Sequence, residues 1–105
     1  MATIIPRFKL IMKYDVVSAK QAEYSHFLLG ELVPGLQSLE LYVTGVYQTV
    51  YGDYPVRQAE FVTESLEIMQ NALHSERYEE LERRLLDYTT NYSRKVVKYR
   101  SGFQF

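Results

Sequence analysis

The sequence predicts an α+β domain in which one antiparallel sheet carries helices on a single face. Three observations lead to this fold class. Four segments have the alternation or the β-branched and aromatic content of strands, and the segments between them have helical periodicity. Only a short turn separates the second strand from the third. The order β-α-β-β-α-β follows from these observations.

The first half of the chain contains a strand and a helix. In residues 7–16, apolar side chains alternate with lysines, which is the period of a strand with one buried face. Ser18 and Gln21 have the spacing of a capping box at the start of a helix, and Pro34-Gly35 is predicted to end that helix. We expect Phe27 to point to its outer side. The predicted apolar face consists of Ala22, Ser25, Leu29, Leu32 and Val33.

The second half supplies the remaining elements. Residues 39–51 and 56–63 are predicted strands joined by a turn at 52–55, and Gly45 is a candidate β-bulge. A short helix begins near Ser65 and is interrupted at His74-Ser75, where Ser75 is placed to cap a second helical segment. The last strand is predicted over 94–100. The stripe of the second segment consists of Tyr78, Leu81, Leu85, Tyr88 and Tyr92.

This order is the ferredoxin-like split βαβ arrangement, in which right-handed crossovers place the helices on one side of a four-stranded sheet. The other side, called the second face below, then mixes apolar and charged residues, and Lys9 or Lys13 can pair with Glu60. We expect Val46 on this face, although a bulge at Gly45 would exchange the two sides of the second strand. Such a half-apolar face predicts a covering chain, and the alternative is a solvated face.

Composition excludes several classes of function. The chain has 105 residues, read as one domain over 1–105, with 47% hydrophobic residues and a net charge of −1, so we expect no nucleic-acid partner. It has no Cys, which excludes disulfides and thiolate metal sites, and its two His lack metal-ligand spacing. No uncharged run is long enough for a membrane helix. We expect no cofactor, no membrane contact and a cytoplasmic location.

Four stretches carry a resemblance that covers nearly the whole chain. They are the strand Phe8–Tyr14, the helix end Leu32-Val33-Pro34-Gly35-Leu36, the hairpin Tyr51-Gly52-Asp53-Tyr54-Pro55, and the segment from Asn71 to Tyr78. With these stretches the chain resembles the dimeric α+β barrel superfamily, and within it the NIPSNAP-like branch. The resemblance implies a homodimer with sheet packed against sheet and a ligand cleft between sheet and helices.

We expect the site in that cleft, because the helix stripes and one sheet face converge there and the break at His74-Ser75 leaves the helical layer incompletely closed. Its predicted polar members are Tyr14, His26, Tyr78 and Tyr88, and its predicted apolar wall is Phe8, Met12, Leu29, Phe61 and Leu85. A His at a cleft edge suits acid–base work. The structural alternative is that His26 lies on the surface and that the tyrosines only fill the sheet and an interface.

The sequence therefore predicts a homodimeric protein that binds a small, mostly apolar ligand. A cofactor-independent monooxygenase or isomerase acting on an aromatic or polyketide-like substrate is the alternative that the resemblance implies. A purely structural dimer is the third possibility.

Overall fold

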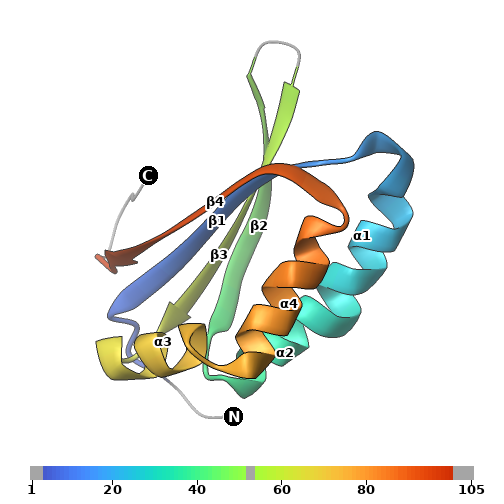
Figure 1. Cartoon of the computed structure of the whole chain (residues 1–105). Helices are drawn as coiled ribbons and strands as arrows, with labels where there is room; N and C mark the ends of the chain where they lie inside the picture. Colours follow the sequence, from blue (N-terminus) through green and yellow to red (C-terminus); the bar gives the residue numbers. More distant parts are fainter. Residues whose placement is uncertain (1–3, 52–53, 101–105) are drawn as a thin grey trace.

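The fold is a four-stranded antiparallel sheet with helices packed on one of its faces (Figure 1). The structure is a computed structural model that describes residues 4–51 and 54–100. The strands are β1 (Phe8–Val16), β2 (Tyr42–Tyr51), β3 (Tyr54–Thr63) and β4 (Thr89–Lys98), and their order in the sheet is β2-β3-β1-β4. This is the ferredoxin-like arrangement that the sequence predicts.

The central strand β1 sets the two faces of the sheet. Leu10 pairs with Phe61 and Met12 pairs with Ala59, and all of these side chains are fully buried beneath the helices. Lys9, Ile11 and Lys13 alternate with them and point to the second face. The alternation predicted for the first strand is therefore confirmed.

The bulge predicted at Gly45 is confirmed, because the register between β2 and β3 shifts between Val43 and Gly45. Its consequence for the faces differs from our expectation. Val46 pairs with Ala59 and packs against the hydrophobic core, so it lies on the helical side. Tyr47 pairs with Gln58 on the second face and is 51% exposed. The extra residue of the bulge exchanges the sides of the strand beyond it.

The first helical stretch is continuous where the sequence predicts an end. It runs through η1 (Ser18–Lys20), α1 (Gln21–Phe27), the π-helix η2 (Leu28–Leu32) and α2 (Val33–Ser38). Pro34 lies in the first turn of α2, where its missing N–H costs little. Gly35 is buried, and a Cβ atom there would lie 2.7 Å from Leu81, so glycine permits the close approach of α2 to helix α4 (Glu76–Leu86). The predicted capping box at Ser18 does not form.

The apolar face predicted for this stretch is correct only in its last turn: Leu32 is buried and Val33 packs against the core, whereas Ala22, Ser25 and Leu29 are exposed. Tyr24, Leu28, Leu32 and Leu36 are buried at four-residue spacing, and Phe27 is 2% exposed instead of pointing outward. Four-residue spacing exceeds the 3.6-residue turn of an α-helix, and the wider π turn within the stretch keeps these side chains on the sheet. Arg84 from α4 forms an ion pair with Glu31 and lies 5.0 Å from the Phe27 ring centroid, which covers Phe27 from outside.

The second helical stretch follows the prediction closely. Ser65 accepts a hydrogen bond from the Ile68 N–H at the start of α3 (Leu66–Leu73), and Ser75 accepts one from the Tyr78 N–H at the start of α4 (Glu76–Leu86). The chain then turns into β4 at Thr89, earlier than expected. Tyr92 consequently lies on this strand and not on the helical stripe where we expected it.

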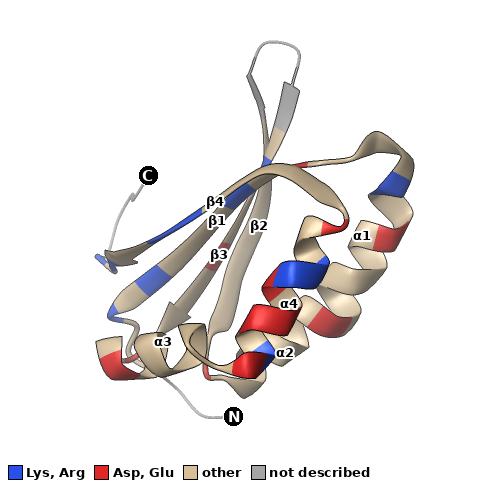
Figure 2. Cartoon of the chain, in the orientation of Figure 1, with Lys and Arg blue, Asp and Glu red and all other residues tan. Residues whose placement is uncertain are grey.

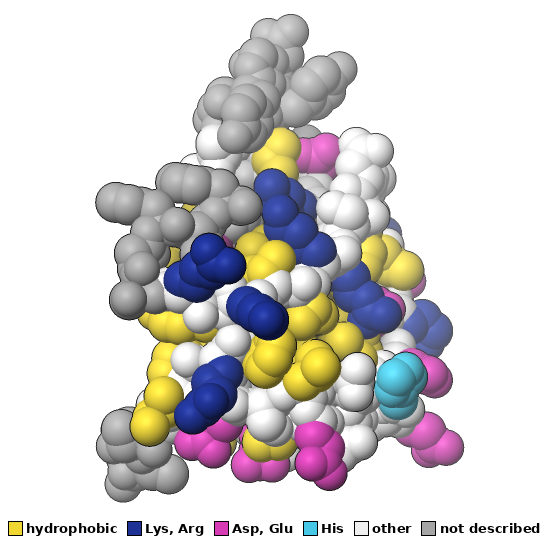
Figure 3. Space-filling model, turned by 90° about the vertical axis from the view of Figure 1, so that its left-hand side faces the viewer, with side chains coloured by type: hydrophobic (Ala, Val, Ile, Leu, Met, Phe, Trp, Pro, Cys, Tyr) yellow, Lys and Arg dark blue, Asp and Glu magenta, His cyan; other side chains and the backbone are white. Residues whose placement is uncertain are grey.

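The second face has no helix over it in the part of the chain that the structure describes (Figure 1). Figure 3 shows hydrophobic side chains interspersed with Lys and Arg across it. Lys9 and Glu60 form an ion pair of 2.9 Å on this face, as predicted, and both residues are more than 90% buried. Ile11 and Val62 lie on the same face and are 1% and 5% exposed.

Candidate functional site

Five of the predicted site residues lie together between the sheet and the helices. Tyr14, Met12 and Phe61 project from the sheet, and Tyr78 and Leu85 project from α4; each is at most 1% exposed. Phe8 and Tyr88 are half-buried at the margin of this core. The Tyr88 ring packs against Phe27, with 5.4 Å between the ring centroids.

Two predicted site residues lie elsewhere. Leu29 is 73% exposed and His26 is exposed, so neither faces the sheet. Both positions follow from the helix face that the sequence pattern misassigned, because the π turn brings Leu28 inward and leaves Leu29 on the solvent side. Tyr24, which we did not select, takes the inward position on α1 and is fully buried.

A polar cluster lies where α4 faces β4, and Glu82 is at its centre. One carboxylate oxygen, Oε2, accepts hydrogen bonds from the Tyr78 hydroxyl at 2.9 Å and from the Tyr92 hydroxyl at 2.6 Å. The same oxygen lies 3.2 Å from Nη1 of Arg94. The Arg94 guanidinium also lies 5.1 Å from the Tyr78 ring centroid. We call Tyr78, Glu82, Tyr92 and Arg94 the Glu82 cluster.

The Glu82 cluster combines the buried Tyr78 and the half-buried Tyr92 with a partly exposed ion pair. The Glu82 and Arg94 side chains are 24% and 37% exposed, whereas Tyr78 is 1% exposed. Burial raises the pKa of Tyr78 to about 12, and burial with the nearby Tyr78 raises the pKa of Tyr92 well above its ordinary value. Both phenols are therefore protonated donors at neutral pH, and the charged groups lie at the surface of the cluster.

A pair of phenols extends the Glu82 cluster into the core. The Tyr14 and Tyr24 hydroxyls lie 2.6 Å apart, and their rings meet edge to face at 5.7 Å. The Tyr14 ring lies 6.5 Å from the Tyr92 ring, which connects the pair to the cluster. Arg57 from β3 lies 5.5 Å from the Tyr24 ring centroid and closes the far side.

This arrangement supplies hydrogen-bond donors, one carboxylate and one guanidinium beside aromatic walls. Such a set can orient a carbonyl or phenol group, and a carboxylate beside a cation can accept a proton from a bound acid. Among the described residues no group of three or more His, Asp or Glu side chains is placed to hold a metal ion.

Three members of the Glu82 cluster escaped the sequence prediction. Glu82 and Arg94 are not among the predicted site residues, and Tyr92 is predicted on the helical stripe. The available signal was the opposition between an acidic 64–87 segment and a basic 94–100 segment. Figure 2 shows most of the acids on the helices, where Lys and Arg also occur, and further basic residues on β1 and β4. The Glu82–Arg94 ion pair joins the two segments.

Comparison with known proteins reveals similarity in structure only. No protein-family model matches the chain, and a search of curated proteins gives no significant match. In the part of the chain that the structure describes, no helix has the length and apolar character needed to cross a membrane.

Several solved structures share the fold. A NIPSNAP family protein from Agrobacterium tumefaciens superimposes with a TM-score of 0.66 at 13% identity, covering 96% of this chain and 92% of its own. A NIPSNAP domain protein from Burkholderia xenovorans gives 0.65 at 8% identity, with coverages of 93% and 99%. A proposed antibiotic biosynthesis monooxygenase from Caulobacter crescentus gives 0.67 at 11% identity, with coverages of 91% and 92%.

At 8–13% sequence identity, structural similarity establishes the fold and does not establish the activity. The element order, the sheet topology and the coverage of whole chains agree with each other. This chain therefore has the ferredoxin-like α+β fold that NIPSNAP family proteins and a proposed antibiotic biosynthesis monooxygenase share.

Proposed function

We propose that the chain is a single-domain subunit of a cytoplasmic homodimer, that the subunits pack through their second faces, and that each subunit binds a small aromatic ligand at the Glu82 cluster. The ligand carries a carbonyl or phenol group. The observation that carries the proposal is the convergence of a buried phenol, a half-buried phenol and a guanidinium on one oxygen of a partly exposed carboxylate.

The Glu82 cluster suits ligand recognition because its groups differ in accessibility. The phenol rings of Tyr78 and Tyr92 form an apolar wall, whereas Glu82 and Arg94 remain open to water. A flat ligand can lie against the half-buried Tyr92 ring and exchange hydrogen bonds with the charged pair. Of the predicted site residues, Tyr14, Met12 and Leu85 support the wall from below.

Ligand titration with variants tests this site. We would titrate 2-naphthol and 2-naphthaldehyde by calorimetry into the unmodified chain and into Glu82→Gln and Arg94→Met. The expected result is binding that weakens about tenfold in each variant, as the loss of a charge-assisted hydrogen bond predicts. The matched controls are Glu80→Gln and Arg83→Met, whose side chains are exposed on the same helix. Equal binding by all five proteins would contradict the proposed site.

The second face supports the dimer. Tyr47 is 51% exposed at one edge of this face, the half-buried Val97 lies on the opposite edge strand, and the buried Lys9–Glu60 pair is already neutralised within one subunit. A partly apolar sheet face of this kind is favourably covered by an identical face related by a two-fold axis.

Sedimentation velocity tests the dimer at micromolar concentration. We expect a species of twice the 12.4 kDa subunit mass. Tyr47→Asp places a charge on the second face and should shift the population toward the monomer. Leu29→Asp is the matched control, because Leu29 is even more exposed but lies on the helical layer. A chain that sediments as a monomer, or two variants that dissociate equally, would contradict the proposed interface.

A cofactor-independent isomerase or monooxygenase is the second candidate function. The observation that favours it is a carboxylate, held by two protonated phenols, next to a guanidinium, since Glu82 can take a proton from carbon while Arg94 stabilises the enolate oxygen. Proton exchange at the central carbon of 1-phenyl-1,3-butanedione in D₂O, followed by NMR, tests the first step. Exchange that Glu82→Gln leaves unchanged would contradict this role, and oxygen consumption with the same compound separates oxygenation from isomerisation.

A further inference from the structure

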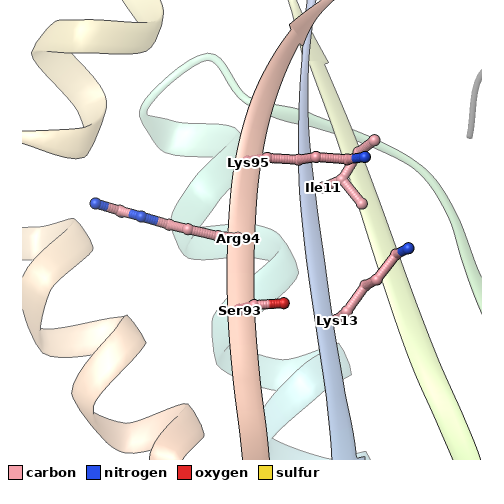
Figure 4. Close-up of a pocket in the computed structure, with 5 residues that line it drawn as sticks. All are labelled: Ile11, Lys13, Ser93, Arg94 and Lys95. Atoms are coloured by element: carbon pink, nitrogen blue, oxygen red, sulfur yellow. The ribbon is translucent and has the colours of Figure 1, made fainter.

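A second polar hollow lies on the second face, away from the Glu82 cluster. It has a volume of about 200 Å³ between β1 and β4, and its lining includes Ile11, Lys13, Ser93 and Lys95 (Figure 4). These side chains project to the same side of the sheet, whereas the Arg94 side chain projects to the opposite side, toward Glu82. The two sites are therefore separated by the thickness of the sheet.

The two lysines of this hollow have no carboxylate partner among the described residues. Glu60 is occupied by Lys9 and by the Gln58 amide. Asp15 follows Lys13 on the same face, but its Oδ2 atom accepts from the Asn91 amide and makes no ion pair with Lys13. Lys13 and Lys95 thus form a positive region without a carboxylate partner among the described residues, on either side of the buried Ile11.

The strand register brings these two cations close together. Ile11 pairs with Lys95 and Lys13 pairs with Ser93, so the two lysines are diagonal neighbours on one face. Like charges in this position repel each other, and a bound anion would relieve that repulsion. Ser93 adds a hydroxyl donor, and Ile11 forms an apolar floor that is 1% exposed.

We infer that this hollow, defined by Ile11, Lys13, Ser93 and Lys95, binds a small organic carboxylate with an apolar body. The ammonium groups and the hydroxyl bind the carboxylate, and Ile11 with the neighbouring Val97 contacts the body. The volume is below the roughly 300–1,000 Å³ of pockets for drug-sized ligands, so the ligand has the size of a single ring or a short chain.

NMR titration of the ¹⁵N-labelled chain tests the inference with three probes. Benzoate carries both the charge and the apolar body, benzyl alcohol carries only the body, and acetate carries only the charge. We expect benzoate to give saturable shifts at Ile11, Ser93 and Lys95, with both other probes binding at least about tenfold more weakly.

Lysine variants make the test specific. Lys13→Met and Lys95→Met should each weaken benzoate binding about tenfold, Lys95→Arg should retain it, and melting curves verify that each variant is folded. Lys20→Met is the control, because Lys20 lies in η1 and donates to the Asp87 carbonyl. Equal binding of benzoate and benzyl alcohol, or unchanged binding in both methionine variants, would overturn the inference.

The experiment separates this inference from the proposed function. Benzoate shifts confined to Tyr78, Tyr92 and Arg94 would assign the anion to the Glu82 cluster and overturn the second site. Binding that persists in Glu82→Gln supports it. In a dimer that packs through the second face, the lysines of the two subunits would repel each other, and bound carboxylate would reduce this repulsion. We therefore expect benzoate to lower the dissociation constant of the dimer. If benzoate binding depends on Lys95 and the chain remains a monomer, the result would contradict the proposed dimer and leave the carboxylate site supported.

Discussion

The buried hydroxyl pair of Tyr14 and Tyr24 allows a sharp test of the core. The two oxygens lie 2.6 Å apart, and the residues are 1% and 0% exposed, so neither hydroxyl has water as a substitute partner. Tyr14→Phe or Tyr24→Phe removes one hydroxyl and leaves the other buried without a partner. Each single variant should lower the free energy of unfolding by about 1–3 kcal/mol. The hydroxyl that remains has given up its hydrogen bonds to water on folding and has no partner in the protein to replace them.

The double variant distinguishes this reasoning from a simple loss of packing. Replacing both hydroxyls leaves two apolar rings of nearly the same shape, which is close to neutral. The unfolding free energy of Tyr14→Phe/Tyr24→Phe should therefore lie above that of either single variant, with a coupling energy close to the sum of the two single losses, about 2–6 kcal/mol. Both rings persist in the double variant, so their edge-to-face contact and the Arg57 contact are retained.

Urea unfolding followed by circular dichroism measures these differences at one fixed protein concentration, since a dimer would add a concentration term. A loss of about 1 kcal/mol corresponds to roughly 4–8 °C in melting temperature for a domain of this size. Additive single-variant effects, with the double variant least stable, would refute the hydroxyl pair as an isolated buried unit.

Three further outcomes test local features. Burial holds the pKa of Tyr78 at about 12, above its ordinary value of 10.0, so the unfolded chain loses this proton at a lower pH than the folded chain. The free energy of unfolding should therefore fall as the pH rises from about 10 to about 12. In urea unfolding at several pH values, Tyr78→Phe should make this fall with pH less steep. Ser75→Ala should cost about 1 kcal/mol in the same assay, whereas Ser18→Ala should stay within about 0.5 kcal/mol, because only Ser75 caps a helix; equal effects would contradict the assignment. Val46→Lys should lower the melting temperature more than Tyr47→Lys, since Val46 packs on the core and Tyr47 is exposed; the reverse order would contradict the effect of the bulge.

Part of the candidate site was predictable from sequence. Tyr14 and Tyr78 lie on elements with a clear period, and the structure places both between the sheet and the helices. Glu82 was not selected, because an acid among Arg and Glu on a helix has the pattern of a solvated side. Only the approach of β4 converts it into the acceptor of two phenols. The hollow on the second face likewise depends on the register between β1 and β4.

The sequence by itself determined the features that depend on neighbouring residues. The alternation of β1, the caps at Ser65 and Ser75 and the interruption at His74 follow from local geometry and local hydrogen bonds, and each is found in the structure. Together with the element order, these local signals are sufficient for the ferredoxin-like topology, because right-handed crossovers leave few alternatives.

The tertiary structure decided which sides of the elements meet. The helix face of Tyr24 and Phe27, and the exposure of His26 and Leu29, depend on a π turn that is stabilised by packing on the sheet and not by its own residues. The start of β4 at Thr89 likewise comes from pairing with β1, which competes successfully with the helical periodicity through Tyr92. Long-range contacts of this kind fix the site, since they form only once the whole sheet is assembled.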